Sequence, residues 1–347
     1  MGDAKHMRAA VVNPYLDSLG GGERYTLAVC EALVDAGYSV DIEWSDQSIK
    51  EKLVSRFGIS MKGISIVDDV KRGDGYHVCF WVSDGSIPLM HAQKNILHFQ
   101  VPFTGVNGKS LMNRMKLFRI KHVVCNSNFT KYFVDREYGV HSVVVHPPVD
   151  TALFTPRKKE NMILYVGRFS KLLQNKRHDV LIECFKELYN KGYKMYRLVL
   201  AGGSDVGLDS TIEALRHSAK GYPIEFMLSP NVKTLKDMYG KARFFWSASG
   251  CGVDGNVNPQ KVEHFGITLV ESMAAGCVPF AYKNGGHVEI VDDSVNGYLW
   301  SRKQELITKT IINIEDKKKR EAIAKCAIAR SRDFSYDHFK KEFIQLL

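Results

Sequence analysis

Apolar and polar residues follow two alternating patterns along most of the chain. Short runs rich in β-branched, aliphatic and aromatic residues are followed by longer segments in which apolar residues recur at helical spacing. Short apolar runs joined by helices are typical of parallel sheets that carry helices on both faces. The predicted strands are Arg8–Asn13, Ser39–Trp44, His77–Ser83, Asn95–Phe99, His122–Asn126, Ser142–Val145, Met162–Gly167, Arg197–Ala201, Ile224–Leu228, Phe244–Ser247, Cys277–Ala281 and Gly297–Trp300.

The same patterns predict helices and a division of the chain. Gly37 is placed as the cap that ends the first helix, and two adjacent prolines, Pro147 and Pro148, interrupt both patterns, which predicts a linker between domains. The predicted helices are about Glu23–Ala36, His178–Asn190, Asp209–Ala219, Val232–Lys241, Thr268–Ala275, Lys303–Ser331 and Tyr336–Leu347.

We therefore predict an α/β fold of two doubly wound, Rossmann-like domains that face a cleft. The first domain spans residues 7–150 and the second spans residues 151–331. Residues 332–347 form a final helix that packs back towards the first domain. In open parallel sheets ligands bind beyond the carboxyl ends of the strands, so the informative residues should lie in strand-to-helix loops.

Composition excludes several classes of protein. A chain of 347 residues with 45% hydrophobic and 25% charged residues is ordinary for two globular domains, not for a collagen, a disulfide-stapled mini-protein or a disordered tail. No apolar run approaches the roughly 18 residues that span a bilayer. The seven cysteines form no C-x-x-C pair, which favours reduced core thiols in a cytosolic protein. We expect no signal peptide and no metal site.

The net charge of +10 is unevenly distributed. No Asp or Glu occurs between Gly85 and Val134, and around Leu111–Ile120 bases alternate with apolar residues at helical spacing. A basic amphipathic helix suits an anionic membrane surface or an anionic acceptor, although an ordinary solvated helix face explains the pattern too. We expect residues 109–121 to contact an anionic membrane, and we interpret Lys317–Arg320 as a solvated helix surface.

Two loops that follow predicted strands offer phosphate-binding chemistry. Gly20, Gly21 and Gly22 open the first helix, where backbone N–H groups can approach a phosphate; a plain tight turn is the other interpretation. Arg168 closes the first strand of the second domain and Lys176 precedes its helix. Two cations at such a turn suit a diphosphate, unless they are merely solvated loop residues.

The third motif is the most specific. Glu263 and Glu271 are separated by seven residues around His264-Phe265-Gly266-Ile267-Thr268-Leu269-Val270. If Gly266 and Ile267 open a helix, Glu271 lies on its first turn and Glu263 in the preceding loop. The helix N-terminus then offers N–H groups to a phosphate, and the carboxylates can accept hydrogen bonds from sugar hydroxyls.

This segment resembles the E-x7-E motif of retaining, family-4-type glycosyltransferases with the GT-B fold. The resemblance extends over nearly the whole chain, through the glycine loop, the Arg168–Lys176 pair and the Pro-Pro-Val-Asp linker. Tyr15–Arg24 and Glu263–Ile267 look most like the mannosyltransferases of dolichol-linked N-glycan assembly. His98-Phe99-Gln100-Val101-Pro102 is similar to the His-Tyr-Pro segment of that group.

The resemblance implies the site residues. His98, Glu263, Arg168 and Lys176 would be catalytic: the two cations hold the donor diphosphate, Glu263 faces the donor sugar, and His98 lies near the reacting centre. The alternative for His98 is a buried core histidine. Gly21 and Gly22 would border the diphosphate, and the base would lie near Ser229. The implied donor-binding residues are Gly21, Gly22, Arg168, Lys176, Ser229, Gly266, Ile267, Thr268 and Glu271, with Glu271 on the ribose.

The implied activity is retaining hexosyl transfer without a metal or any cofactor other than the nucleotide-sugar donor. The donor is GDP-mannose first, then a UDP-sugar carrying glucose or an N-acetylhexosamine. The acceptor is a glycan or a lipid-linked glycan, and the expected location is the cytoplasm or the cytoplasmic face of a membrane. The alternatives are a nucleotide-sugar epimerase or phosphorylase on the same fold, and, more distantly, a basic nucleic-acid-binding protein, for which no recognisable motif is present.

Two segments depart from the family pattern. The loop from Ser249 to Val262 is long and rich in glycine, and residues 170–175 form a longer connection than usual. The second departure leaves Lys171, Lys176 and Arg177 as candidates for the phosphate contact, of which we predict Lys176.

Overall fold

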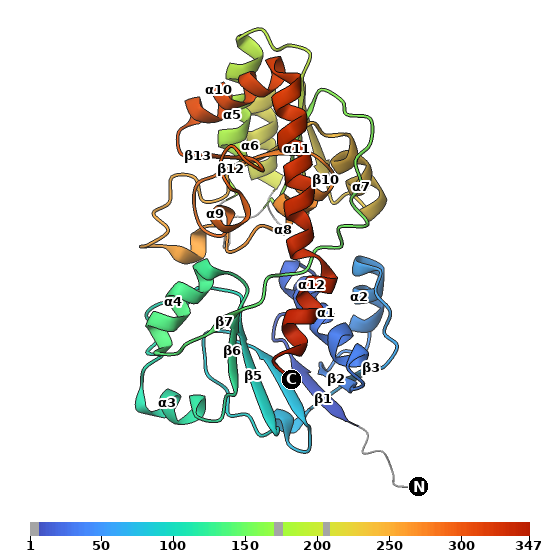
Figure 1. The fold of residues 1–347 in the computed structure, drawn as a ribbon, viewed down its shortest axis with the longest axis vertical. Coiled ribbons are helices and arrows are strands. Elements are labelled where there is room, and N and C mark those ends of the chain that lie inside the picture. Colours follow the sequence, from blue (N-terminus) through green and yellow to red (C-terminus); the bar gives the residue numbers. More distant parts are fainter. Residues whose placement is uncertain (1–6, 170–175, 204–208) are drawn as a thin grey trace. The chain divides into compact units, whose positions relative to one another are not determined.

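The computed structural model describes residues 7–169, 176–203 and 209–347 (Figure 1). The chain forms two compact units. The N-terminal unit comprises the residues up to Pro148 together with Tyr336–Leu347, and the C-terminal unit comprises Val149–Ser335. Within the described residues, no helix is long and apolar enough to span a membrane.

The N-terminal unit contains a seven-stranded sheet in the order β3-β2-β1-β4-β5-β6-β7, with every pair of neighbours parallel. Its strands are β1 (Arg8–Val12), β2 (Ser39–Glu43), β3 (Ile64–Val67), β4 (Val78–Val82), β5 (Lys94–Phe99), β6 (His122–Cys125) and β7 (Val143–Val144). Its helices are α1 (Gly21–Asp35), α2 (Ile49–Phe57), α3 (Leu111–Leu117), α4 (Asn128–Tyr138) and α12 (Tyr336–Ile344).

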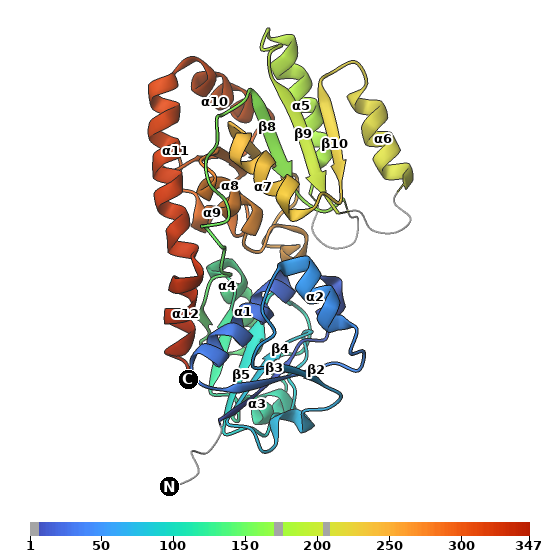
Figure 2. The same cartoon turned by 90° about the vertical axis from the view of Figure 1, so that its right-hand side faces the viewer.

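The core of this unit explains why the last helix belongs to it. β1 is buried from Ala9 to Val12, and α1 covers one face of the sheet with residues such as Leu27 and Leu33. Both views show α12 beside α1 (Figures 1 and 2). Phe339 of α12 meets the ring of Tyr25 edge-on, with centroids 5.3 Å apart. Apolar burial therefore ties α12 to the N-terminal sheet.

The C-terminal unit repeats this architecture with a six-stranded parallel sheet in the order β10-β9-β8-β11-β12-β13. Figure 2 shows β8, β9 and β10 side by side with α5 beside them. The strands are β8 (Met162–Val166), β9 (Arg197–Gly202), β10 (Ile224–Leu228), β11 (Phe244–Ser247), β12 (Val278–Tyr282) and β13 (Tyr298–Trp300). The helices are α5 (His178–Asn190), α6 (Asp209–Ala219), α7 (Val232–Lys241), α8 (Ile267–Ala274), α9 (His287–Ile290), α10 (Lys303–Glu315) and α11 (Lys317–Ser331).

These sheets confirm the predicted fold class, and each predicted strand is present. The short edge strand β3 and the helices α2, α4 and α9 were not predicted. The prediction of one helix over Lys303–Ser331 is wrong, because Asp316 leaves helical geometry (φ −96°, ψ 93°) and its side chain accepts the N–H of Lys319. An aspartate in that position starts a new helix, so α10 and α11 are separate.

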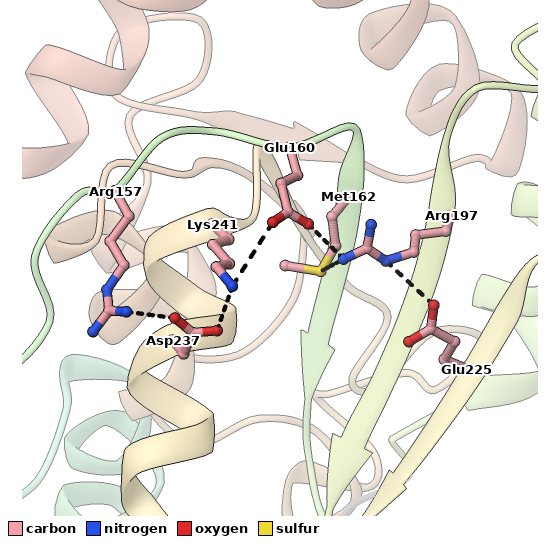
Figure 3. Close-up of polar contacts among 7 residues, drawn as sticks. All are labelled: Arg157, Glu160, Met162, Arg197, Glu225, Asp237 and Lys241. Carbon is pink, nitrogen blue, oxygen red and sulfur yellow. Dashed lines mark hydrogen bonds and ion pairs between the residues drawn. The ribbon is translucent and has the colours of Figure 1, made fainter.

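An ion-pair network occupies the edge of the C-terminal sheet where the strands begin (Figure 3). Arg197 reaches Glu160 at 2.7 Å and Glu225 at 3.3 Å. Lys241 reaches Asp237 at 2.8 Å, and Arg157 pairs with the same carboxylate. These groups are a third exposed or more, so each pair contributes about 1 kcal/mol or less. The network lies before the strands, whereas the candidate site lies after them.

Candidate functional site

The candidate site lies along the edge of the C-terminal sheet where its parallel strands end. Arg168 follows β8 and is exposed. Ser229 follows β10, is exposed, has φ +47°, and donates its N–H to the carbonyl of Gly202 at 2.8 Å. A Cβ on Gly202 would lie 2.1 Å from the carbonyl oxygen of Gly167, so the turns after β8 and β9 approach as closely as two glycines allow. Parallel strands thus bring these predicted residues to one edge.

Lys176 and Glu263 form the central contact of this edge. The Nζ of Lys176 lies 2.6 Å from Oε2 of Glu263, and the two side chains are 16% and 15% exposed. Lys176 precedes α5, and Glu263 precedes α8. Lys171, the rival candidate, lies outside the described residues. Arg177 binds Asp179 and the carbonyl of Cys251 instead. The structure therefore joins two residues that were predicted for different parts of the donor.

The environment keeps Glu263 ionised. Burial would raise the pKa of this carboxyl, but the charge and hydrogen bond of Lys176 outweigh that effect and lower the pKa from 4.5 to about 2. Because the folded-state pKa is lowered, the pair stabilises the fold above pH 4.5, and this contribution is lost as the pH falls through about 2. At neutral pH Glu263 accepts hydrogen bonds and has no proton to donate.

The N-terminus of α8 adjoins Glu263 in the chain. Gly266 has φ +124°, a conformation that favours glycine. Ile267 and Thr268 follow in the first turn, where helix geometry leaves backbone N–H groups without an acceptor inside the helix. The first turn thus combines partial positive charge with available donors, as an anion requires.

Glu271 lies on the second turn of α8, not the first as predicted, because the helix begins at Ile267. It is 7% exposed, and its Oε2 accepts the hydroxyl of Tyr239 at 2.8 Å. Sequence reasoning missed Tyr239, because its position on α7 becomes informative only when α7 and α8 are seen to pack together.

A glycine pair after β12 positions Glu263 and was also missed. Gly285 has φ +56°, and a Cβ there would lie 2.1 Å from the carbonyl oxygen of Glu263. The N–H of Gly286 donates to that same carbonyl at 2.8 Å. A side chain on Gly285 would push the Glu263 backbone away, and one on Gly286 would push away the backbone of His264 and Phe265. The available signal was the Gly-Gly dipeptide that follows the predicted strand Cys277–Ala281 after three residues.

His287 follows this glycine pair and is 1% exposed. Burial lowers its pKa, although Glu263 opposes that effect, so the ring is neutral at pH 7. Nδ1 lies 3.0 Å from the carbonyl of Tyr282, which can only accept, so Nδ1 carries the proton. Nε2 then accepts the hydroxyl of Ser247 at 3.3 Å. His287 thereby links β11 and β12 behind Glu263. No three His, Cys, Asp or Glu side chains gather as a metal site would require in the described ranges.

Replacing Gly286 by alanine is expected to lower the free energy of unfolding by about 2–3 kcal/mol. The new Cβ would lie 2.4 Å from Cα of Phe265, so the segment before α8 must shift. Urea unfolding measures the loss, and Gly203→Ala is the control because a Cβ there meets nothing within 4 Å. Equal stability of the two variants would contradict the tight packing of the glycine pair.

The glycine loop of the N-terminal unit forms the start of α1. Gly20 precedes the helix, and a Cβ on Gly22 would lie 2.1 Å from Oε1 of Gln100. The carboxylate of Glu23 accepts the N–H of Gly20 and the hydroxyl of Ser18, both at 2.7 Å. Glu23 is 4% exposed, and sequence reasoning missed it. Gly21 and Gly22 are therefore held in an ordered helix start, and their contact with a diphosphate stays a prediction.

The predicted catalytic residue His98 lies on β5 of the N-terminal unit. It is 0% exposed in β5, inside the N-terminal core. Its ring stacks on Tyr25 and Phe80, with centroids 4.1 Å and 5.4 Å away. Burial lowers its pKa to about 3, so the ring is neutral. The side chain is therefore buried, as the alternative that the sequence left open requires, and the catalytic role of His98 stays a prediction.

His98→Phe is expected to fold and to keep donor turnover, because the aromatic stack survives. It should also change the response to acid. The unfolded wild type binds a proton at His98 below pH 6.5 and the folded one does not until about pH 3, so the wild type loses stability between these values. The variant should avoid a loss on the order of 2 kcal/mol at pH 5, measured by urea unfolding at pH 5 and 7. Loss of turnover with an intact fold would support the catalytic role instead.

Solved structures share this architecture. A structure of Anabaena Alr3699/HepE in complex with UDP and glucose matches with a TM-score of 0.72, covering 98% of this chain and 99% of that one at 16% identity. A glycosyltransferase from Rickettsia africae matches with a TM-score of 0.76, covering 98% and 97% at 18% identity. At these identities the match shows the fold, which is the GT-B fold of two Rossmann-like units.

The family model described as "Glycosyl transferases group 1" matches residues 152–330, more than half of the chain and the whole of the edge described above. The chain belongs to this glycosyltransferase family, as the E-x7-E resemblance predicted.

Several relatives with an assigned activity are mannosyltransferases. A Dictyostelium discoideum GDP-Man:Man(3)GlcNAc(2)-PP-Dol alpha-1,2-mannosyltransferase is 28% identical over 61% of this chain and 43% of its own length. The human protein of that name is 28% identical over 64% of this chain and 47% of its own. The Alpha-1,3/1,6-mannosyltransferase ALG2 of D. discoideum is 34% identical over 31% of this chain and 25% of its own. The chain thus matches less than half the length of these relatives.

Proposed function

We propose that the protein transfers a hexose, with retention of configuration, from a nucleotide-sugar donor to a glycan or lipid-linked acceptor, and that the donor is GDP-mannose. The observation that carries this proposal is the contact between Lys176, which precedes α5, and Glu263, which precedes α8. It brings a cation to an ionised carboxylate that adjoins the N–H groups of a helix N-terminus in the chain. Support for mannose and for a lipid-linked acceptor comes from the names of the curated relatives.

The negative charge that develops on the leaving group gives Arg168 and Lys176 a role in the reaction. When the glycosidic bond breaks, the nucleoside diphosphate gains negative charge. Arg168, Lys176 and the first-turn N–H groups of α8 would stabilise that charge where it develops. Two protein cations and a helix N-terminus can supply this stabilisation, so the proposal includes no metal and no cofactor other than the donor.

The ionisation of Glu263 favours a binding role. A carboxylate with a pKa of about 2 is weakly basic and paired with an ammonium, so it is a poor nucleophile and has no proton to give. It can accept hydrogen bonds from sugar hydroxyls. We therefore propose that the acceptor attacks the anomeric carbon on the face from which the diphosphate leaves, and that Glu263 holds the sugar. Retention follows from this geometry without a covalent sugar–enzyme intermediate.

An epimerase or phosphorylase on the same fold is the second candidate, and the transferase relatives do not favour it. The cytoplasmic side of a membrane remains our proposed location, based on the lipid-linked substrates in the relatives' names and on cysteines suited to a reducing compartment. An epimerase would convert the donor sugar without any acceptor, and NMR of the donor after incubation would reveal it.

A thermal-shift panel without added metal tests the donor. Binding to the folded state raises the unfolding temperature by mass action. We expect GDP and GDP-mannose to stabilise the protein, and UDP, UDP-glucose and UDP-N-acetylglucosamine to leave it unchanged. Stabilisation by the UDP compounds alone would overturn the choice of donor. No response to any of the compounds would contradict the proposed nucleotide-sugar site.

A further inference from the structure

Helix α3 of the N-terminal unit exposes large apolar side chains to solvent. Leu111 is 74% exposed, Met112 and Met115 are each 68% exposed, and Phe118, at the end of the helix, is 93% exposed. Such exposure costs free energy in water, so apolar residues gathered on one short helix indicate a surface that something covers.

These residues share one face of the helix. Positions 111, 112, 115 and 118 follow the spacing i, i+1, i+4 and i+7, which places them on one side of an α-helix. Arg114 and Lys116 fall on opposite flanks of that side. We call Leu111, Met112, Met115 and Phe118 with these two flanking bases the α3 face.

The α3 face is not needed for packing within its own unit. Asn113 and Leu117, which point the other way, are half-buried, and Leu117 packs against a core cluster that contains Val123 and Tyr138. Leu117 also lines a pocket of about 210 Å³ beside Lys121 and His122. The inner side of the helix therefore packs against the unit, whereas the α3 face on its outer side is exposed to solvent.

A second anchor fixes the loop that leads into α3. The carboxylate of Glu137 accepts the N–H groups of Gly105, Val106 and Gly108 at 2.9, 3.0 and 3.2 Å. Burial would raise the pKa of Glu137, but these hydrogen bonds and Lys109 outweigh that effect and lower it. The loop that precedes α3 is thus held in place by hydrogen bonds to Glu137, which fixes the start of the helix that carries the exposed residues.

The segment of the chain that contains the α3 face has an excess of basic residues. The segment from Gly85 to Val134 holds no Asp or Glu, and Glu137 is the carboxylate bound to the loop before the helix. Lys109, Arg114, Lys116, Arg119 and Lys121 all lie within thirteen residues of one another along the chain. An apolar strip flanked by bases has the chemistry of a helix that lies in the interface of an anionic bilayer.

We propose that the α3 face docks on an anionic membrane surface, with its apolar side chains at the headgroup–acyl boundary and its bases among the lipid phosphates. This inference extends the proposed function, since a docked enzyme meets a lipid-linked acceptor in two dimensions. It does not depend on the identity of the donor. An equally apolar protein partner would not require the surrounding bases, and a second copy of the chain would bring two positive surfaces together.

Vesicle flotation tests the proposal with the whole chain and no donor. The probes are phosphatidylcholine vesicles with and without phosphatidylserine. We expect binding to the anionic vesicles and a drop of about fivefold for each engaged basic side chain when phosphatidylserine is omitted. The double variant Met115→Ser/Phe118→Ser should bind anionic vesicles at least about tenfold more weakly.

The control is Met195→Ser/Val257→Ser, which removes residues that are 68% and 70% exposed in the C-terminal unit. It should bind vesicles like the wild type. Both double variants should keep the nucleotide-induced thermal shift, so failure of membrane docking and failure of the donor site remain distinguishable. Equal retention on neutral and anionic vesicles would overturn the proposal. So would full binding by the α3 double variant, or a wild-type dimer in sedimentation that this variant dissociates.

Discussion

Lys176→Met is expected to lower kcat/KM for the donor by about 10² to 10³-fold. Methionine keeps the length of the side chain and removes the charge that would meet the leaving diphosphate, and the loss of one such preorganised group costs a factor of this size. The variant also leaves Glu263 without the ammonium 2.6 Å away, so the pKa of that carboxyl should rise from about 2. Release of GDP from GDP-mannose gives the rate, and calorimetric titration with GDP gives the affinity.

The control for this experiment is Lys158→Met, which removes the same charge from an exposed residue before β8. Its activity should match that of the wild type. We expect the Lys176→Met defect to appear in kcat as well as in GDP affinity, because the diphosphate is more negative in the transition state than in the bound donor. An unchanged kcat with only a weaker GDP affinity would contradict the role of Lys176 in stabilising the leaving group.

Glu263→Gln is expected to separate nucleotide binding from turnover. Glutamine can still accept a hydrogen bond from a sugar hydroxyl or from Lys176, but it lacks the charge that strengthens such bonds. Turnover of GDP-mannose should fall by about 10- to 100-fold, the range for a hydrogen bond to a charged group. GDP, which has no sugar, should bind as tightly as before or more tightly, because Lys176 is released from its carboxylate partner.

This split distinguishes sugar binding from a merely structural role. If Glu263 served only to hold the local fold, turnover and GDP affinity would fall together and the unfolding temperature would drop with them. If turnover stayed at the wild-type level, the charge of Glu263 would have no essential function. Glu213→Gln, which changes a carboxylate that is 72% exposed on α6, is the matched control and should alter neither quantity.

The fold was predictable because buried parallel strands leave a strong local signal. β8 reads Met-Ile-Leu-Tyr-Val and is buried at every position, so its apolar run and its assignment agree. β3 has four residues, Ile-Ser-Ile-Val, and only Ile64 and Ile66 are buried, so its pattern was too short to detect. The break at Asp316 was missed because the flanking segments both have helical composition, and the break depends on one backbone conformation.

The candidate site was predictable only in part. Motif spacing placed Arg168, Lys176 and Glu263 at the ends of strands, where ligands bind in such sheets. The contact between Lys176 and Glu263 joins residues 87 positions apart and depends on how β8, β11 and β12 are ordered in the sheet. For His98, the sequence could not predict whether the side chain is exposed or buried. Its position near a strand end favoured a functional role, but whether its side chain meets solvent or Tyr25 depends on α1 and α12, which no local pattern reveals.

A crystal structure with GDP-mannose bound would test the central claim most directly. The account predicts that the diphosphate lies within hydrogen-bonding distance of Arg168, Lys176 and the first-turn N–H groups of α8, with Glu263 on the hydroxyls of the mannose. It also predicts that Lys176 turns from Glu263 towards the diphosphate or is shared between them. A diphosphate bound away from the N-terminus of α8, with the Lys176–Glu263 pair undisturbed, would contradict it.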